Sequence, residues 1–475
     1  MKDDADAGSV RAYDLAVIGA GSAGFSAAIT AATLNKRVAL IGHGSIGGTC
    51  VNVGCVPSKA MIRAAEALHG ARTAHRFPGL SGAAQIDDWS QLLGAKDEMV
   101  SQMRDRKYRD LLPQYPLVDY IDEGAARLAA GGVQINDRLV RAPRVIVATG
   151  ARSWLPPIDG IDKVTTLDST ALLELTQLPQ SLTFIGGGYI GAELALMMAR
   201  FGVAVTMVCR SRLLPGAEPE ISAALSESFR TEGITLHDGL SYQSCHEDEK
   251  GVTVTATKDG EPFEITSQML VVTAGRRANT DDMALAQSGV TLDARGAIVV
   301  GDDMQSSAPG IYAAGDVTGR DQFVYMAAYG AKVAGRNAVA GEALKYDNDV
   351  MPWVVFTDPQ VAGVGLSEAR AKARGLDVKT SVLPLDAVPR AIAARATHGL
   401  IKLVAERRTD RLLGGQIIAP EGSDSIQTLV MGLKSGMTTR GLGETIFPYL
   451  TTVEGIRLAA QTFDIDVAKL SCCAG

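Results

Sequence analysis

Short, mostly apolar runs recur along the chain, and two of them lead into a glycine-rich turn and an apolar segment with helical spacing. The first such run covers residues 13–18, with its turn at 19–24 and a helix that ends near Leu34. Another apolar run follows at 37–41. Mostly apolar strands joined through a helix are typical of parallel sheets buried on both faces. The pattern therefore predicts a βαβ unit near the N-terminus.

The same pattern returns in the middle of the chain. A strand at 181–185 leads into a turn at 186–191, a helix to about Phe201 and a strand at 203–208. This stretch is very apolar, but charged residues and glycines interrupt it, so we expect no membrane insertion. The two units together predict two Rossmann-like nucleotide-binding domains.

After about residue 346 the pattern becomes that of antiparallel strands mixed with helices. We expect strands at 353–356, 399–404 and 412–418, and helices at 367–373 and 423–435. This arrangement is typical of an α+β domain. The fold class is therefore predicted to be α/β, with two nucleotide-binding domains and a C-terminal α+β domain. The predicted limits are 1–153 with 275–345, then 154–274, and finally 346–475.

Charge and composition narrow the range of partners. The 475 residues carry a formal net charge of -7, which argues against binding to nucleic acid. The acidic N-terminus has no apolar segment of the kind found in a secretory signal. We therefore expect a cytoplasmic protein. In that reducing compartment, closely spaced cysteines are more often redox-active or metal-binding than structural.

Glycine motifs open both predicted helices. A GxGxxG turn after a strand lets a pyrophosphate approach the N-terminus of the following helix. A glycine turn without a ligand is the alternative at either place. The candidate cofactor-binding glycines are Gly19, Gly21 and Gly24 in the first unit, and Gly186, Gly188 and Gly191 in the second.

The acid that commonly binds the ribose is missing from both units. In the second unit its place, 18 residues past the last motif glycine, is taken by Cys209, followed by Arg210 and Arg212. Two guanidinium groups suit the 2′-phosphate of NADP, although they could also be solvated loop residues. In the first unit the same count gives Gly42. That ribose must be held in another way, or less tightly.

Cys50 and Cys55 lie just before a predicted helix at about 58–68. Their spacing allows a disulfide and does not suit zinc. The N-terminus of that helix and Lys59 would lower a thiol pKa. We therefore predict a redox-active dithiol pair.

A second thiol pair, Cys472 and Cys473, lies two residues from the C-terminus. Two thiol pairs at opposite ends of the chain predict handling of a soft, thiol-seeking metal ion. An incidental pair in the tail, or a strained vicinal disulfide, is the alternative. The remaining cysteines, Cys209 and Cys245, are expected to be structural or incidental.

The segment at 47–59, GGTCVNVGCVPSK, resembles the redox-active motif of the flavin-dependent pyridine nucleotide–disulfide oxidoreductases. Segments 147–150 and 310–316 resemble that family's FAD motifs, 186–191 its NAD(P)H motif, and 351–359 the start of its dimerisation domain. The resemblance implies that FAD binds the first nucleotide-binding domain, that NADPH binds the second, and that the chain forms a homodimer.

The same resemblance assigns roles to individual residues. It implies that Cys55 contacts the flavin, that Cys50 is the exchanging thiol, and that Lys59 and Glu193 form a pair beside the flavin. Further residues that it implies at the FAD site are Gly48, Thr49, Lys59, Thr149, Gly150 and Asp316.

Members that reduce glutathione or dihydrolipoamide carry a His-Pro pair near the C-terminus, where this chain has Phe447 and Pro448. Phenylalanine has no proton to donate to a leaving thiolate, so a disulfide substrate is disfavoured. The segment FPYLTTVEG and the Cys-Cys tail resemble the mercuric ion reductase branch of the family. This implies NADPH-dependent reduction of Hg(II) to Hg(0), with Tyr189 and Tyr449 lining the metal site.

In that branch, the resemblance implies that Cys472 and Cys473 of one subunit deliver Hg(II) to Cys50 and Cys55 of the other. Many of its members begin with an extra metal-binding domain, which we expect to be absent here because about 12 residues precede the first strand. Two alternatives stay open. One is a disulfide reductase of the same family, and the other is a flavoprotein that binds mercury without turnover.

Overall fold

The computed structural model describes residues 12–469. The chain folds into two compact units, each of which is assembled from separate stretches of sequence. The first comprises Met1–Ser58, Ser90–Trp154 and Arg276–Asp347, and the second comprises Lys59–Trp89, Leu155–Gly275 and Asn348–Gly475.

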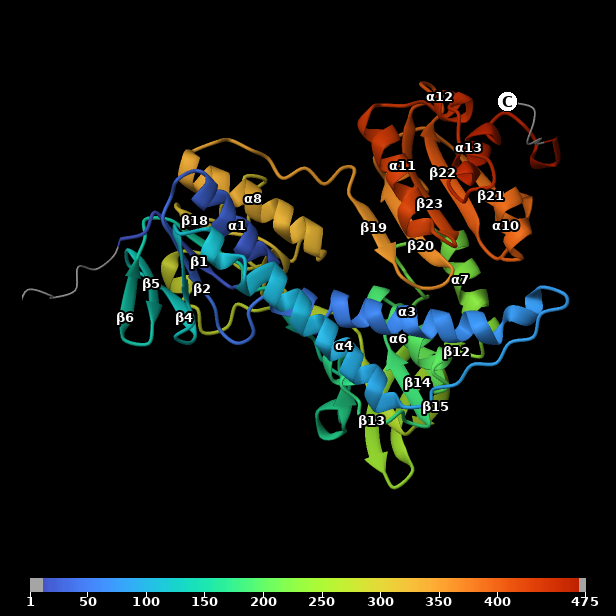
Figure 1. Cartoon of the computed structure of the whole chain (residues 1–475), viewed down its shortest axis with the longest axis horizontal. Coiled ribbons are helices and arrows are strands. Elements are labelled where there is room, and N and C mark those ends of the chain that lie inside the picture. Colours follow the sequence, from blue (N-terminus) through green and yellow to red (C-terminus); the bar gives the residue numbers. More distant parts are fainter. Residues whose placement is uncertain (1–11, 470–475) are drawn as a thin grey trace, which may run out of the picture. The chain divides into compact units, whose positions relative to one another are not determined.

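The first unit is built on a five-stranded parallel sheet in the order β18-β7-β1-β2-β3 (Figure 1). All residues of β1 and β2 are buried, as their apolar sequences predict. Helices α1 and α8 pack against each other and against the sheet. The bounds are β1 Leu15–Ile18, β2 Val38–Ile41, β3 Val118–Ile121, β7 Val145–Val147, β18 Ile311–Ala313, α1 Ser22–Thr33 and α8 Val324–Ala340.

Smaller elements complete this unit. A three-stranded antiparallel sheet joins the same hydrophobic core, and β8 pairs with β17 where the chain leaves and re-enters the unit. The bounds are β4 Ala126–Ala129, β5 Gly132–Ile135, β6 Arg138–Arg141, β8 Ala151–Ser153, β17 Arg276–Ala278, and α2 Gly48–Asn52. One sequence boundary between the units falls within helix α3 Cys55–Arg72, and another falls after the first residue of helix α4 Trp89–Arg104.

The second unit contains another parallel sheet, in the order β12-β11-β10-β16-β9, and an antiparallel sheet β13-β14-β15. The bounds are β9 Thr166–Leu167, β10 Ser181–Ile185, β11 Ala204–Val208, β12 Thr235–His237, β13 Leu240–Asp248, β14 Gly251–Lys258, β15 Glu261–Ser267, β16 Met269–Val272, α5 Ser169–Leu173, α6 Tyr189–Arg200 and α7 Pro219–Thr231.

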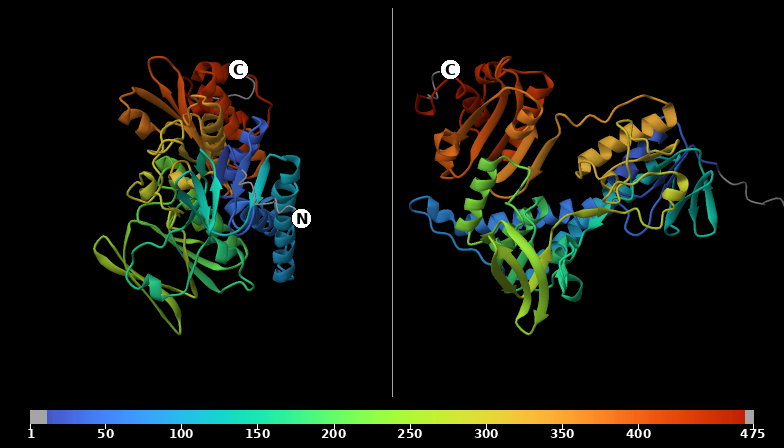
Figure 2. Two further views of the ribbon diagram at one scale, coloured as in Figure 1. Left: turned by 90° about the vertical axis from the view of Figure 1, so that its left-hand side faces the viewer. Right: turned by 180° about the vertical axis from the view of Figure 1, so that it is seen from behind.

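The C-terminal part of the second unit is a five-stranded antiparallel sheet, β19-β20-β23-β22-β21, with helices α11 and α13 on one face (Figure 2). The prediction of an α/β fold with a C-terminal α+β part is confirmed. The bounds are β19 Pro352–Val355, β20 Gln360–Gly365, β21 Val378–Pro384, β22 Leu400–Glu406, β23 Leu412–Ala419, α9 Glu368–Ala373, α10 Pro389–Ala394, α11 Gly422–Lys434, α12 Thr439–Glu444 and α13 Glu454–Gln461.

A buried lysine joins this antiparallel sheet to helix α7. The Lys402 ammonium lies 3.2 Å from Glu218, 2.9 Å from Glu220 and 2.9 Å from Glu368, and its side chain is only 2% exposed. Burying a single charge is costly unless opposite charges and hydrogen bonds compensate it. The three carboxylates supply that compensation, so the contact holds only while the lysine is present.

We therefore expect Lys402→Met to destabilise the protein by about 3–5 kcal/mol, because Glu218 would be left buried without its cation. Lys372→Met is the matched control, because Lys372 also binds Glu368 but is exposed, and we expect it to cost less than about 1 kcal/mol. Chemical denaturation measures both. Equal losses would contradict this account.

The same cluster predicts an acid dependence. Hydrogen bonds from Lys372 and Lys402 lower the pKa of Glu368 from 4.5 to about 2. A carboxylate with a lowered folded pKa stabilises the protein above its unfolded pKa, and this contribution is lost as the pH falls from about 4.5 towards 2. In Lys402→Met, that acid-dependent loss of stability should be smaller than in the unmodified protein.

Candidate functional site

The first glycine turn brings strand β1, helix α1 and strand β7 close together. A Cβ on Gly24 would clash with the carbonyl of Gly19, and a Cβ on Gly19 would clash with the carbonyl of Ala148. Gly19 also has φ +115°, a conformation that favours glycine. A Cβ on Gly48 would lie 2.7 Å from the Cα of Gly21. These close approaches suit a loop that admits the pyrophosphate of a dinucleotide at the start of α1.

The second glycine turn repeats this geometry in the other unit. A Cβ on Gly186 would lie 2.7 Å from the carbonyl oxygen of Thr273, and one on Gly191 would lie 2.6 Å from the Thr273 hydroxyl. Beside Gly188 there is open space, with no described atom within 4 Å of the place that a Cβ would take. An open approach to the middle glycine is what a phosphate group requires.

Two helices carry the thiol pair. Cys50 lies in α2 and Cys55 is the first residue of α3, and both are half-buried. Between them, a Cβ on Gly54 would lie 3.3 Å from the Cα of Cys50, so the chain doubles back closely at this point. The Asn52 amide donates to the carbonyls of Ile46 and Gly48 and thereby holds the loop around Cys50.

Tyr108 was not identified from the sequence. Its hydroxyl lies 3.2 Å from the Ser22 hydroxyl, and its ring meets Phe25 edge-on at 4.8 Å. Burial raises its pKa, the bond with Ser22 lowers it, and the charges of Cys50 and Cys55 raise it. A Cβ on Gly47 would lie 3.1 Å from its Cδ2, so the ring packs beside the segment that leads to Cys50. No local motif in the sequence marks this residue, because its role depends on contacts with distant segments.

Thr149 and Asp316 lie at the ends of two neighbouring strands of the first sheet. The Thr149 hydroxyl donates to the carbonyl of Asn279 at 2.6 Å, and the Asn279 amide donates back to the Thr149 carbonyl. Burial raises the pKa of Asp316, and Arg276, at 3.8 Å, opposes that shift. Gly150, with φ +71°, leaves the neighbouring space open.

A partly buried ion pair joins Lys59, the first residue of the second unit, to Glu193. Glu193, with a side chain that is 7% exposed, accepts a bond from the Lys59 ammonium at 2.5 Å. Its other carboxylate oxygen accepts from the backbone N–H of Phe356 at 2.9 Å. The Lys59 ammonium also lies 4.9 Å from the Phe356 ring centroid. The predicted Lys59–Glu193 pair thus exists, and a strand-end backbone orients the carboxylate.

Tyr189, the first residue of α6, stacks on Trp353 of strand β19, with ring centroids 5.5 Å apart and an interplanar angle of 14°. Opposite Trp353 in the neighbouring strand is Gly363, where a Cβ would lie 2.6 Å from the indole Cε2. The Trp353 indole therefore occupies space that is free only because residue 363 is a glycine. Burial raises the pKa of Tyr189 to about 12, so its hydroxyl stays protonated at neutral pH.

The remaining residues predicted for the site lie in other segments of the chain. Tyr449 is 56% exposed, whereas Phe447 packs against the core of the antiparallel sheet. Arg210 is exposed, and Arg212 donates to the carbonyls of Pro215 and Ala217. Cys472 and Cys473 lie outside the described residues.

Cys209 and Cys245 are buried, and burial raises the pKa of Cys209 to about 12 and that of Cys245 to about 11. Such thiols are poor nucleophiles at neutral pH. Within residues 12–469 no three His, Cys, Asp or Glu side chains gather as a metal site, and no helix is long and apolar enough to cross a membrane.

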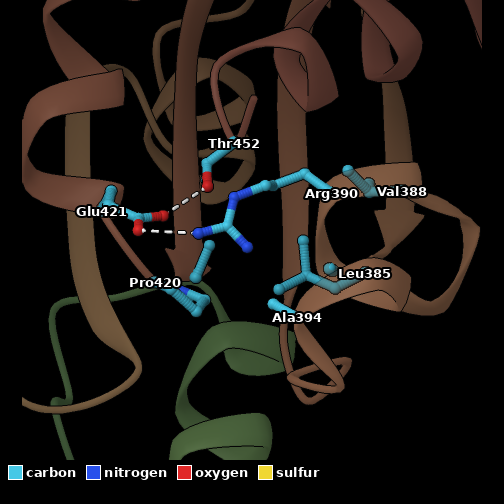
Figure 3. A pocket seen from close by; sticks show the side chains of 9 residues that line it. Leu385, Val388, Arg390, Ala394, Pro420, Glu421 and Thr452 are labelled. Carbon is cyan, nitrogen blue, oxygen red and sulfur yellow. Dashed lines mark hydrogen bonds and ion pairs between the residues drawn. The ribbon is translucent and has the colours of Figure 1, made fainter. Parts of the chain in front are cut away.

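Figure 3 shows a small hollow between the C-terminal sheet and helix α10. Glu421 lies at one side of this hollow, where it accepts a hydrogen bond from the Thr452 hydroxyl at 2.6 Å and pairs with Arg390 at 3.2 Å. Its volume of about 10 Å³ is that of a single water molecule. The hollow is therefore too small for a dinucleotide cofactor.

The chain belongs to the pyridine nucleotide-disulphide oxidoreductase family, whose model matches residues 13–335, and the dimerisation domain of that family matches residues 351–460. The family implies a flavin and a pyridine nucleotide, and the second match indicates a homodimer. The predicted family is confirmed.

Among curated proteins, the chain is 43% identical to a mercuric reductase of Streptomyces lividans, covering 98% of each chain. It is 44% identical to one of Lysinibacillus sphaericus, covering 98% of this chain and 85% of that one. Among solved structures it is similar to the HOCl-induced flavoprotein disulfide reductase RclA of Escherichia coli, with a TM-score of 0.83 and 28% identity, over 94% of this chain and 99% of that one.

The stack between Tyr189 and Trp353 predicts energetic coupling between the two side chains. In a double-mutant cycle with Tyr189→Leu and Trp353→Leu, we expect a coupling of about 0.5–1.5 kcal/mol in the free energy of unfolding. Trp89→Leu is the control, because Trp89 packs on Phe201 at the other end of α6 and should not couple to Tyr189. Additive effects for both pairs would refute the stack.

Proposed function

We propose that this protein is an NADPH-dependent mercury(II) reductase that reduces Hg(II) to Hg(0) through FAD and the Cys50–Cys55 pair. The observation that carries this proposal is the similarity to mercuric reductases, at 42–44% identity over 98% of the chain. In the overall reaction NADPH gives two electrons to Hg(II), and the products are NADP⁺, a proton and Hg(0).

We assign FAD to the first nucleotide-binding domain, 1–153 with 275–345, and NADPH to the second, 154–274. Both glycine turns have the close approaches of a pyrophosphate-binding loop. The order of the two cofactors rests on the resemblance of 147–150 and 310–316 to FAD motifs and of 186–191 to an NAD(P)H motif. Bound FAD would supply a two-electron carrier between the nicotinamide and the thiols. On this proposal, Lys59 holds its charge beside the flavin, and Glu193 keeps that ammonium in place.

The chemistry of the substrate suits the cysteines. Hg(II) is a soft ion that prefers thiolate ligands. We propose that Cys472 and Cys473 in the tail of one subunit bind the ion and pass it, by exchange of one thiolate for another, to Cys50 and Cys55 of the other subunit. Tyr189 and Tyr449 would line the path, and the homodimer would be required for turnover. Vicinal thiols stay reduced most readily in the cytoplasm, where we place the enzyme.

A disulfide reductase is the second candidate, because RclA bears that description and shares the fold. Phe447 argues against it, since a disulfide reductase needs an acid to protonate the leaving thiolate.

The tail separates these two activities. We expect Cys472→Ala/Cys473→Ala to abolish Hg(II)-dependent NADPH oxidation while leaving reduction of the flavin and of the Cys50–Cys55 pair by NADPH intact. Stopped-flow spectra measure the half-reaction, and the loss of NADPH absorbance measures turnover. Cys209→Ala/Cys245→Ala is the matched control, because both thiols are buried. Undiminished mercury turnover in the tail variant, or disulfide reduction by the unmodified protein, would contradict the proposal.

Cofactor preference should depend on Arg210 more than on Arg212. Arg210 is exposed at the end of β11, whereas Arg212 is bonded to its own loop. We expect Arg210→Gln to lower kcat/KM for NADPH about 10- to 100-fold, with little change for NADH, because a charged hydrogen bond to the 2′-phosphate is lost. Arg212→Gln should affect stability more than preference. An equal loss with both nucleotides for Arg210→Gln would contradict this role.

A further inference from the structure

Gly42 directly follows strand β2, at the place where nucleotide-binding folds commonly carry a ribose-binding acid. Its backbone N–H donates to the carbonyl of Ile121 at 2.8 Å, so the parallel pairing of β2 with β3 continues past the end of the strand. The position is therefore well ordered by backbone bonds, although it has no side chain.

The volume beside Gly42 is filled by Tyr120. A Cβ at position 42 would lie 2.8 Å from Cε2 and 2.9 Å from Cζ of the Tyr120 ring, and closer still to its hydroxyl oxygen. No acid could occupy position 42 without displacing that ring. The phenol thus stands where the first atoms of the usual acid would be.

Tyr120 also lies on the correct face of the sheet. It is paired in register with Leu40, and side chains alternate along a strand, so Leu40, Gly42 and Tyr120 share one face. Leu40 approaches the position of a Cβ on Gly24 to 3.5 Å, which places this face towards helix α1. The first glycine turn opens that same helix, so the phenol and the turn border the same side of the sheet edge.

The hydroxyl has the protonation and freedom needed to bind a ligand. Burial raises the pKa of Tyr120, and Asp122 raises it further, so the phenol stays neutral and can donate. Tyr13, two residues before strand β1, instead donates its hydroxyl to Asp119 of β3 at 3.0 Å. Within residues 12–469 the structure gives the Tyr120 hydroxyl no such bond.

We propose that the Tyr120 hydroxyl replaces the missing acid and binds the ribose hydroxyls of the adenosine half of FAD. This inference rests on the assignment of FAD to the first nucleotide-binding domain. A neutral phenol in place of a carboxylate can both donate to and accept from a ribose hydroxyl, and its contribution does not depend on pH near neutrality.

The test is FAD binding by apoprotein, followed through quenching of flavin fluorescence. We expect Tyr120→Phe to raise the Kd for FAD about 2- to 10-fold, the effect of losing one hydrogen bond. Tyr13→Phe is the matched control, because it removes a tyrosine hydroxyl that binds Asp119 in the same strand β3, and the Kd for FAD should stay unchanged. FAD analogues that lack the 2′- or the 3′-hydroxyl of the adenosine ribose should bind more weakly to the unmodified protein but lose this penalty in Tyr120→Phe.

A second pair of variants tests the same inference without the Tyr120→Phe substitution. Gly42→Glu alone should weaken FAD binding, because its side chain collides with the ring. Gly42→Glu combined with Tyr120→Val should recover affinity, because it restores an acid and makes room for it.

Two results would overturn the inference. If the unmodified protein binds FAD, but Tyr120→Phe has the same Kd and the same response to the analogues, Tyr120 only fills space and the proposed function stands. If the unmodified protein binds no FAD at all, both proposals fail.

Discussion

The structure depends on close approaches of backbone to backbone that only glycine allows. At both strand–turn–helix junctions, a Cβ on the last motif glycine, Gly24 or Gly191, would meet the carbonyl of the first. Each helix therefore packs closely against its sheet, and its N-terminus lies at the end of the strands, where a pyrophosphate can bind. On the proposed assignment, the ends of the neighbouring strands contact the ribose. Tyr120 fills that place beside Gly42, and Cys209 packs beneath Gly187 with Arg210 exposed next to it.

In the second unit, one short strand holds the start of helix α6 in two ways. Trp353 of β19 stacks on Tyr189, and the backbone N–H of Phe356, just past the strand, binds Glu193. Glu193 in turn holds Lys59. Farther along, Lys402 ties helix α7 to the same antiparallel sheet. The second nucleotide-binding region and the antiparallel sheet thus share buried charges and stacked rings, which fix the side chains that we assign to the flavin and metal site.

Much of this fold could be predicted from the sequence, because its signals are local. Apolar strands, glycine turns and the segment around Cys50 and Cys55 each lie within a few residues, and the fold class and family that they predicted are confirmed. Trp353, Tyr108 and Tyr120 could not be found in this way, because each acts through a segment far away in the sequence. Gly42 and Gly363 were the available signals, since a glycine at the end of a strand or inside one can mark the place of a neighbouring ring.

The central claim is that electrons from NADPH reach Hg(II) and leave the protein with the metal. The most direct measurement is the amount of elemental mercury vapour released per NADPH oxidised by the purified flavoprotein, with Hg(II) supplied as its complex with excess small thiol. The account predicts one Hg(0) for each NADPH. NADPH oxidation that is unaffected by Hg(II), or that releases no mercury vapour, would contradict it.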